Sequence, residues 1–125
     1  MNKIIVSINP IYVKNILNET KKYEYRRVAA KQDVKSILIY ETAPIKMVVA
    51  EVEILEVLEC SPEELWNKTK DLSGTSKQFF DAYFAGKDIA YAYKLGKVTP
   101  YENPKSLKEY GVKYAPQSFI YYNEI

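Results

Sequence analysis

The chain has 125 residues, a net charge of +2, 47% apolar residues and 27% charged residues, which is typical of one compact soluble domain. No apolar run approaches the ~20 residues of a membrane-spanning helix, and the N-terminal apolar run is too short for a signal peptide, so we expect a cytoplasmic protein with no membrane contact. The absence of histidine and the single cysteine, Cys60, exclude histidine triads, the usual His-containing zinc sites and an internal disulfide, and no Asp-rich loop indicates a metal held by carboxylates alone. We therefore expect no metal and no cofactor, and any acid–base chemistry must come from Lys, Glu, Asp or Tyr.

The N-terminal part of the chain predicts a strand followed by a helix. Residues 3–8 are mainly apolar and are expected to form the strand. Asn9 and Pro10 then predict a helix start, because Asn caps helix N-termini and Pro fits the first helical position. Apolar residues follow at helical spacing, and the helix is expected to end near residues 18–20.

The segment TKKYEYRR that follows holds four cations, one carboxylate and two aromatic side chains. In an extended strand the side chains alternate, so Lys22, Glu24 and Arg26 are expected on one face. Such a face can hold an anionic ligand, or it can be a solvated strand whose ion pair contributes little energy. The opposite face is expected to carry Tyr23, Tyr25 and Arg27.

The remaining pattern predicts further strands and two helices in the middle of the chain. The long apolar stretch at 46–59 changes phase, which indicates a bulge or bend, and Gly96 indicates another. Ser61 and Ser76 are helix caps. The side chains of Phe79, Phe80, Tyr83 and Phe84 form a stripe predicted to pack on the strands. The predicted strands are 36–40, 46–59, 89–101 and 118–122, with helical segments after Ser61, after Ser76 and at 106–110.

About six strands with peripheral helices predict an α+β fold. Bends in two strands favour a small, mostly antiparallel β-barrel over an open sheet. No linker or repeat divides the chain, so we expect a single domain over residues 1–125.

Tyrosine is frequent, with twelve copies in the chain. Tyrosine can stack on nucleic-acid bases, but it is also common in strands and at the rims of cores. For any single tyrosine the packing role is favoured. Several lie near the C-terminus: Tyr101, Tyr110, Tyr114, Tyr121 and Tyr122.

The charged segment and its approach read ETKKYEYR, which resembles the G-x-K-x-x-E-x-R pattern after the first helix of the ASCH domain, a branch of the PUA-like superfamily. Lys21, Glu24 and Arg26 match this pattern, and Glu19 stands where glycine is expected. A glycine there would allow a left-handed helix end, so either Glu19 ends the helix differently or Asn18 takes that conformation. Further similar segments are SINP (7–10), IYETAPIK (39–46) and APQSF (115–119).

The resemblance implies a β-barrel with a cleft at one mouth and a role in RNA binding. Some small members resemble amidohydrolases that deacetylate N4-acetylcytidine, and a ribonuclease has been proposed for others. In the cleft, Lys21 and Arg26 are expected to hold phosphate, while Glu24 orients Arg26 or accepts from a base amino group. Three further residues are candidates for the nucleic-acid-binding surface, although each also has an ordinary structural role: Lys22, Arg27 and Ser118.

Three functions are open at this point. The favoured one is a regulatory module that binds RNA or a modified nucleotide. The alternative is an amidohydrolase in which Lys21 acts as base or activator and Glu24 activates water. Against it, Glu24 is expected to raise the pKa of Lys21, and the small hydrolases carry Thr at that position. A weaker third is a protein-interaction adaptor that uses the acidic face at Glu51–Glu64 and the tyrosines; no sequence feature indicates an oligomeric state.

Overall fold

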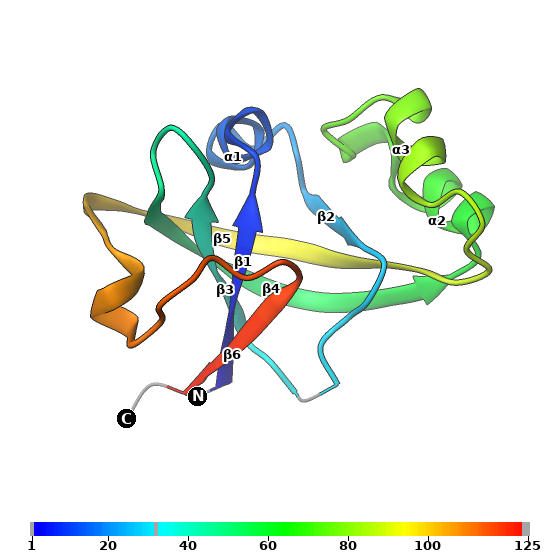
Figure 1. The fold of residues 1–125 in the computed structure, drawn as a ribbon. Coiled ribbons are helices and arrows are strands. Elements are labelled where there is room, and N and C mark those ends of the chain that lie inside the picture. Colours follow the sequence, from blue (N-terminus) through cyan, green and yellow to red (C-terminus); the bar gives the residue numbers. More distant parts are fainter. Residues whose placement is uncertain (1, 32, 124–125) are drawn as a thin grey trace.

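The computed structural model describes residues 2–31 and 33–123. Within these residues a six-stranded sheet is flanked by three α-helices and two short 3-10 helices, which gives an α+β fold (Figure 1). None of these helices is long and apolar enough to cross a membrane. The strands are β1 (Asn2–Ile8), β2 (Tyr23–Arg26), β3 (Ser36–Glu41), β4 (Met47–Cys60), β5 (Ala90–Lys105) and β6 (Phe119–Asn123), and the helices are α1 (Pro10–Leu17), α2 (Pro62–Thr69), η1 (Lys70–Leu72), α3 (Lys77–Tyr83) and η2 (Leu107–Tyr110).

The sheet is mixed, with the strand order β2-β5-β4-β3-β1-β6. β1 and β3 are parallel, and every other pair of neighbours is antiparallel. The predicted closed barrel is not confirmed, because β2 and β6 are edge strands and no ladder joins them in the described part of the chain. β2 has only four residues, and a side chain crosses the gap instead: Arg26 Nη2 donates to the Ser118 carbonyl at 3.1 Å.

Bulges in β4 and β5 confirm the predicted bends. The register of this pair shifts between Val52 and Ile54, and again between Ile54 and Glu56. Gly96 lies at the bend because a Cβ there would come within 2.9 Å of the Leu55 side chain. Beyond the bend the two strands continue as a long arm, and α2 and α3 lie at its far end (Figure 1).

Two apolar clusters hold the helices on the sheet. The larger one joins α1 to the sheet, with Val13 and Ile16 packed on the strands. The second joins α2 and α3 to β2 and β5, where the Tyr25 ring meets Phe80 edge to face at 4.9 Å. Tyr25 therefore packs, as predicted. Because side chains alternate along a strand, Glu24 is left free to face the space beside α1.

Helix α1 ends differently from both expectations. Asn9 caps its start, where the side-chain oxygen accepts from Ile11 N at 3.2 Å. At its end Glu19 itself takes the left-handed conformation with φ 65°, whereas Asn18 has φ −88°. A non-glycine residue pays about 1–2 kcal/mol for this conformation. The Glu19 carboxylate also accepts from Lys22 Nζ at 2.7 Å, which holds the turn that leads into β2.

Candidate functional site

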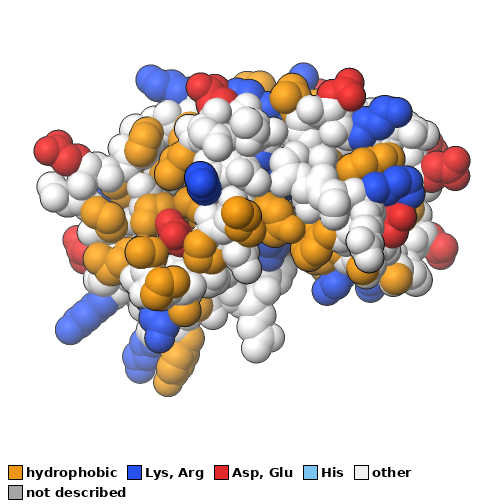
Figure 2. All heavy atoms as spheres, turned by 90° about the horizontal axis from the view of Figure 1, so that it is seen from above, with side chains coloured by type: hydrophobic (Ala, Val, Ile, Leu, Met, Phe, Trp, Pro, Cys, Tyr) orange, Lys and Arg blue, Asp and Glu red, His pale blue; other side chains and the backbone are white. Residues whose placement is uncertain are grey.

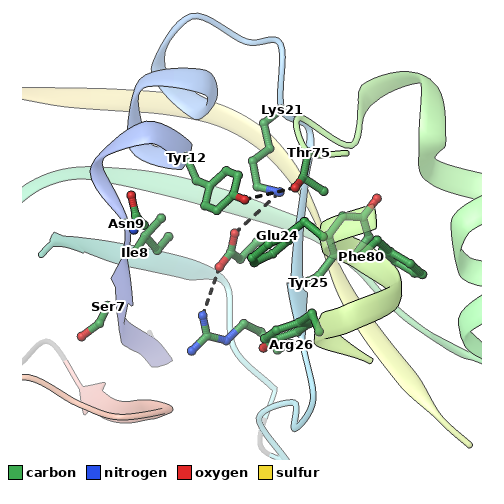
Figure 3. Close-up of a pocket in the computed structure, with 12 residues that line it drawn as sticks. Ser7, Ile8, Asn9, Tyr12, Lys21, Glu24, Tyr25, Arg26, Thr75 and Phe80 are labelled. Atoms are coloured by element: carbon green, nitrogen blue, oxygen red, sulfur yellow. Dashed lines mark hydrogen bonds and ion pairs between the residues drawn. The ribbon is translucent and has the colours of Figure 1, made fainter. Parts of the chain in front are cut away.

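A pocket lies between α1, β2, α3 and the end of β1 (Figure 3). Its volume is about 150 Å³. One wall is aromatic and the floor is charged. The residues that line it are Ser7, Ile8, Asn9, Tyr12, Lys21, Glu24, Tyr25, Arg26, Thr75, Phe79, Phe80 and Tyr83.

The three residues of the charged motif meet in this pocket. Glu24 lies between the two cations (Figure 3): its Oε2 is 3.1 Å from Arg26 Nη1, and its Oε1 is 4.0 Å from Lys21 Nζ. Lys21 is 3% exposed and Glu24 is 6% exposed. Glu24 and Arg26 share a face of β2, as the alternation predicted. Lys22 precedes the strand, so the alternation does not apply to it. Lys21, rather than Lys22, is the third charged residue that lies beside Glu24 and Arg26.

Lys21 is enclosed by aromatic rings and one carbonyl. Its Nζ donates to the Ser73 carbonyl at 2.8 Å and lies 5.2 Å and 4.8 Å from the ring centres of Tyr12 and Tyr25. Burial lowers the pKa of Lys21, and the opposing effect of Glu24 is smaller. Glu24 raises the pKa of Lys21 as expected, but the net shift is downward because desolvation of the buried ammonium is the larger effect.

The loop between α2 and α3 covers Lys21. Gly74 has φ +66°, and a Cβ on it would come within 2.6 Å of Lys21 Cγ, so a residue without a side chain is required. The loop is fastened by Asn15, whose amide donates to the Gly74 carbonyl at 3.2 Å, and by Lys22 N, which donates to the Leu72 carbonyl at 2.8 Å. The loop was not among the site residues predicted from the sequence. The sequence SGT after η1 was the available signal, because a glycine between two hydroxyl residues is typical of a tight turn.

The segment before β6 closes the pocket on the Arg26 side. Arg26 Nη2 donates to the Ser118 carbonyl, and Ser7 Oγ donates to the Pro116 carbonyl at 2.8 Å. Ser118 was a candidate for the binding surface, with a structural role as the alternative. It is exposed and does not line the pocket; its backbone oxygen holds Arg26 instead.

The other two predicted residues lie outside the cavity. Lys22 pairs with Glu19. The Arg27 guanidinium lies 4.2 Å from the ring centre of Tyr83, and its Nε donates to the Tyr83 carbonyl at 2.8 Å. Because Tyr83 lines the pocket, Arg27 borders the mouth, whereas Lys22 belongs to the turn after α1.

The aromatic wall was predicted as core, and only part of it is core. Phe80 is 1% exposed, but Phe79 is 46% exposed and stacks on Tyr83 at 6.0 Å. Tyr12 faces Phe79 at 5.5 Å, and its hydroxyl is 3.1 Å from Thr75 Oγ1. Consecutive residues point in different directions from a helix, since one turn takes 3.6 residues, so Phe79 and Phe80 could not both face one core.

A pocket of this kind suits a flat ring with polar edges. A cavity of about 150 Å³ can hold a single aromatic ring. The aromatic wall offers stacking, Glu24 offers an acceptor, and Lys21 and Arg26 offer donors. Arg26 is the more exposed of the two cations, with 15% of its side chain accessible.

Comparison with known proteins finds relatives that contain an ASCH domain. An ASCH domain-containing ribonuclease from Zymomonas mobilis is 27% identical over 115 residues, which cover 90% of this chain and 78% of that protein. The crystal structure of ASCH from Zymomonas mobilis superimposes with a TM-score of 0.88 and 24% identity, and covers 98% of this chain and 88% of that one. No family model matches the chain.

Two longer proteins also match. Large ribosomal subunit protein uL22 of Ureaplasma parvum is 32% identical over 119 residues, and ATP synthase subunit alpha of the same organism is 29% identical over 119 residues. Each match covers 94% of this chain, but the chain spans only 38% and 15% of the lengths of these two relatives. The chain therefore shares the fold of the Zymomonas mobilis ASCH protein and is similar in sequence to the ASCH domain-containing ribonuclease of that organism.

Proposed function

We propose that the chain is a module that binds RNA or a modified nucleotide, with the pocket as its ligand cleft. The observation that carries the proposal is the convergence of Lys21, Glu24 and Arg26 against an aromatic wall in a cavity large enough for one ring. A stacked base with hydrogen bonds to its edges is the usual way in which proteins read single-stranded RNA.

Depth in the cavity suggests a role for each charged side chain. Lys21 is too deeply buried to meet a phosphate, so we assign it to a carbonyl oxygen of the base. Glu24 accepts from a base amino group. Arg26, nearer the rim, binds the phosphate attached to that nucleotide, and Ser118 holds Arg26 in place. Arg27, which borders the mouth, extends the positive rim.

The relatives support this reading. One is named a ribonuclease, which acts on RNA. The two Ureaplasma proteins have unrelated names and match over a small part of their length, which fits a module that occurs within longer proteins. We further propose that the hydrogen bond from Arg26 of β2 to the Ser118 carbonyl completes a PUA-like barrel with the cleft at its mouth, and that the protein is cytoplasmic.

Fluorescence anisotropy with pools of single-stranded and structured RNA tests the proposal. Arg26→Gln keeps a donor for the Ser118 carbonyl but removes the charge, and is expected to weaken binding by about 1.5–3 kcal/mol, the value of a hydrogen bond to a charged group. Lys87→Gln is the matched control, because Lys87 is exposed and lies outside the pocket. Affinity is expected to fall with salt. Absence of salt-sensitive binding by the wild type, or equal effects of the two substitutions, contradicts the proposal.

The amidohydrolase alternative gains support from one observation, the lowered pKa of Lys21. In its neutral form, the Lys21 amine can take a proton from a water molecule, and the resulting hydroxide attacks the acetyl carbonyl of N4-acetylcytidine. Lys21 then gives this proton to the departing N4 amine, so that the C–N bond breaks and acetate and cytidine form. Chromatography after incubation with N4-acetylcytidine tests it. Production of cytidine by the wild type and its loss in Lys21→Met support the alternative. No cytidine at any pH from neutral to mildly alkaline rejects it.

A further inference from the structure

One tyrosine near the C-terminus differs from its neighbours in exposure. Tyr110 and Tyr122 pack edge to face at 5.2 Å, and the Tyr121 hydroxyl accepts from Lys31 N at 2.8 Å. Tyr114 is 81% exposed. Fully buried aromatic rings are explained by the core, whereas an exposed ring of this size presents an open face on which another ring can stack.

Tyr114 borders an open groove with lysines along it. The groove has a volume of about 540 Å³ and is lined by Leu107, Lys108, Gly111, Val112, Lys113 and Tyr114. Lys108 and Lys113 are both exposed. The carboxylate of the nearby Glu109 is engaged in the cap of η2, where it accepts a hydrogen bond from Ser106 N at 2.9 Å. Seen from above, Lys and Arg side chains lie beside apolar side chains at the end of the molecule that carries η2, at the left of Figure 2.

The chain segment that follows the groove is hydrogen-bonded to the pocket. Two residues that line the pocket hold the segment that leads away from the groove: Ser7 through the Pro116 carbonyl and Arg26 through the Ser118 carbonyl. Pro116 is buried and lies two residues after Tyr114, so their Cα atoms are at most about 7 Å apart. Tyr114 therefore lies in the same chain segment as the Pro116 and Ser118 carbonyls that contact the pocket residues.

We propose that Tyr114 is a second base-stacking site, where a single-stranded RNA held in the pocket stacks a further base and where Lys113 and Lys108 contact its phosphates. The proposal rests on the proposed function of the pocket. It commits to nucleic acid because the groove combines an open aromatic face with cations that suit an anionic backbone. Every base has a π-face, so the contact adds affinity with little dependence on sequence.

The test compares short and long ligands. Binding of a mononucleotide pool is measured by calorimetry, and binding of a single-stranded RNA of about eight nucleotides by anisotropy, within the usual range of site sizes. The longer RNA is expected to bind more tightly. Tyr114→Ala is expected to weaken it roughly tenfold, as for loss of one stacked base, and to leave the mononucleotide unaffected. Because Tyr114 is exposed, thermal melting of this variant should match the wild type.

Salt dependence separates a phosphate contact from general charge. Lys113→Gln is expected to reduce the slope of log affinity against log salt by about 0.7, the value for one contact with a single strand, while Lys87→Gln leaves it unchanged. If Tyr114→Ala binds the longer RNA like the wild type while Arg26→Gln weakens both ligands, this inference fails and the pocket proposal stands. If the wild type binds neither ligand, both fail. If Tyr114→Ala weakens binding of a polyglutamate peptide but leaves RNA binding unchanged, the inference is also overturned, and the groove binds an acidic protein partner instead.

Discussion

Replacing Gly74 by Ala is expected to disrupt the loop between α2 and α3 that covers Lys21. Gly74 has φ +66°, a conformation that costs a residue with a Cβ about 1–2 kcal/mol. The new Cβ would also come within 2.6 Å of Lys21 Cγ and 2.9 Å of Lys21 Cα. Neither atom is the mobile end of a side chain, so the loop or the start of β2 must shift, and overpacking of this kind costs about 1–3 kcal/mol. The expected loss in the free energy of unfolding is therefore about 2–5 kcal/mol.

Gly86→Ala separates the two contributions. Gly86 has φ +79°, but a Cβ there would meet nothing within 4 Å, so its loss should be limited to about 1–2 kcal/mol. Urea unfolding of both variants measures the difference, which we expect to be about 1–3 kcal/mol. Gly74→Ala should also weaken binding of RNA, since Lys21 is displaced. Equal stability losses for the two variants would refute the reasoning that the loop packs closely over Lys21.

Two further predictions concern the aromatic side chains. Burial raises the pKa of Tyr25 to about 12. Below pH 10 the wild type is expected to be about 1 kcal/mol more stable than Tyr25→Phe, because of the 2.6 Å hydrogen bond to Thr69. Because the tyrosine of the unfolded chain ionises from about pH 10, this advantage should fall as the pH rises above 10 and be lost well before pH 12. Urea unfolding at a series of pH values measures it, and a constant difference would contradict it. Phe79→Ala should weaken RNA binding by about 1–3 kcal/mol with little loss of stability, because Phe79 is half exposed. Phe80→Ala should lower the free energy of unfolding by about 3–5 kcal/mol, because Phe80 is buried. Unchanged RNA binding by Phe79→Ala would show that the aromatic wall does not contact RNA.

Features that depend on neighbouring residues could be predicted from the sequence. The caps at Asn9 and Ser61 mark helix starts in the structure as the pattern indicated. The shared face of Glu24 and Arg26 follows from alternation along four residues of strand. These inferences need only local geometry, which the residue order determines.

Features that depend on contacts between residues far apart in the sequence could not be predicted. The burial of Lys21, and with it the direction of its pKa, comes from a carbonyl 52 residues further along the chain and from the space left by Gly74. Closure of the sheet depends on how close β2 and β6 come, and here a single Arg26 side chain spans the gap. The left-handed Glu19 is held by Lys22, a contact that the family pattern with glycine did not suggest.

The central claim is that a base enters the pocket between α1 and α3. Photo-crosslinking of single-stranded RNA that contains 4-thiouridine, followed by mass spectrometry of the digested protein, tests it most directly. We expect crosslinks at Tyr12, Phe79 or Tyr83, which line the pocket, and their loss with excess unlabelled RNA. Competed crosslinks confined to the far arm, for example near Leu55 or Trp66, would contradict the claim.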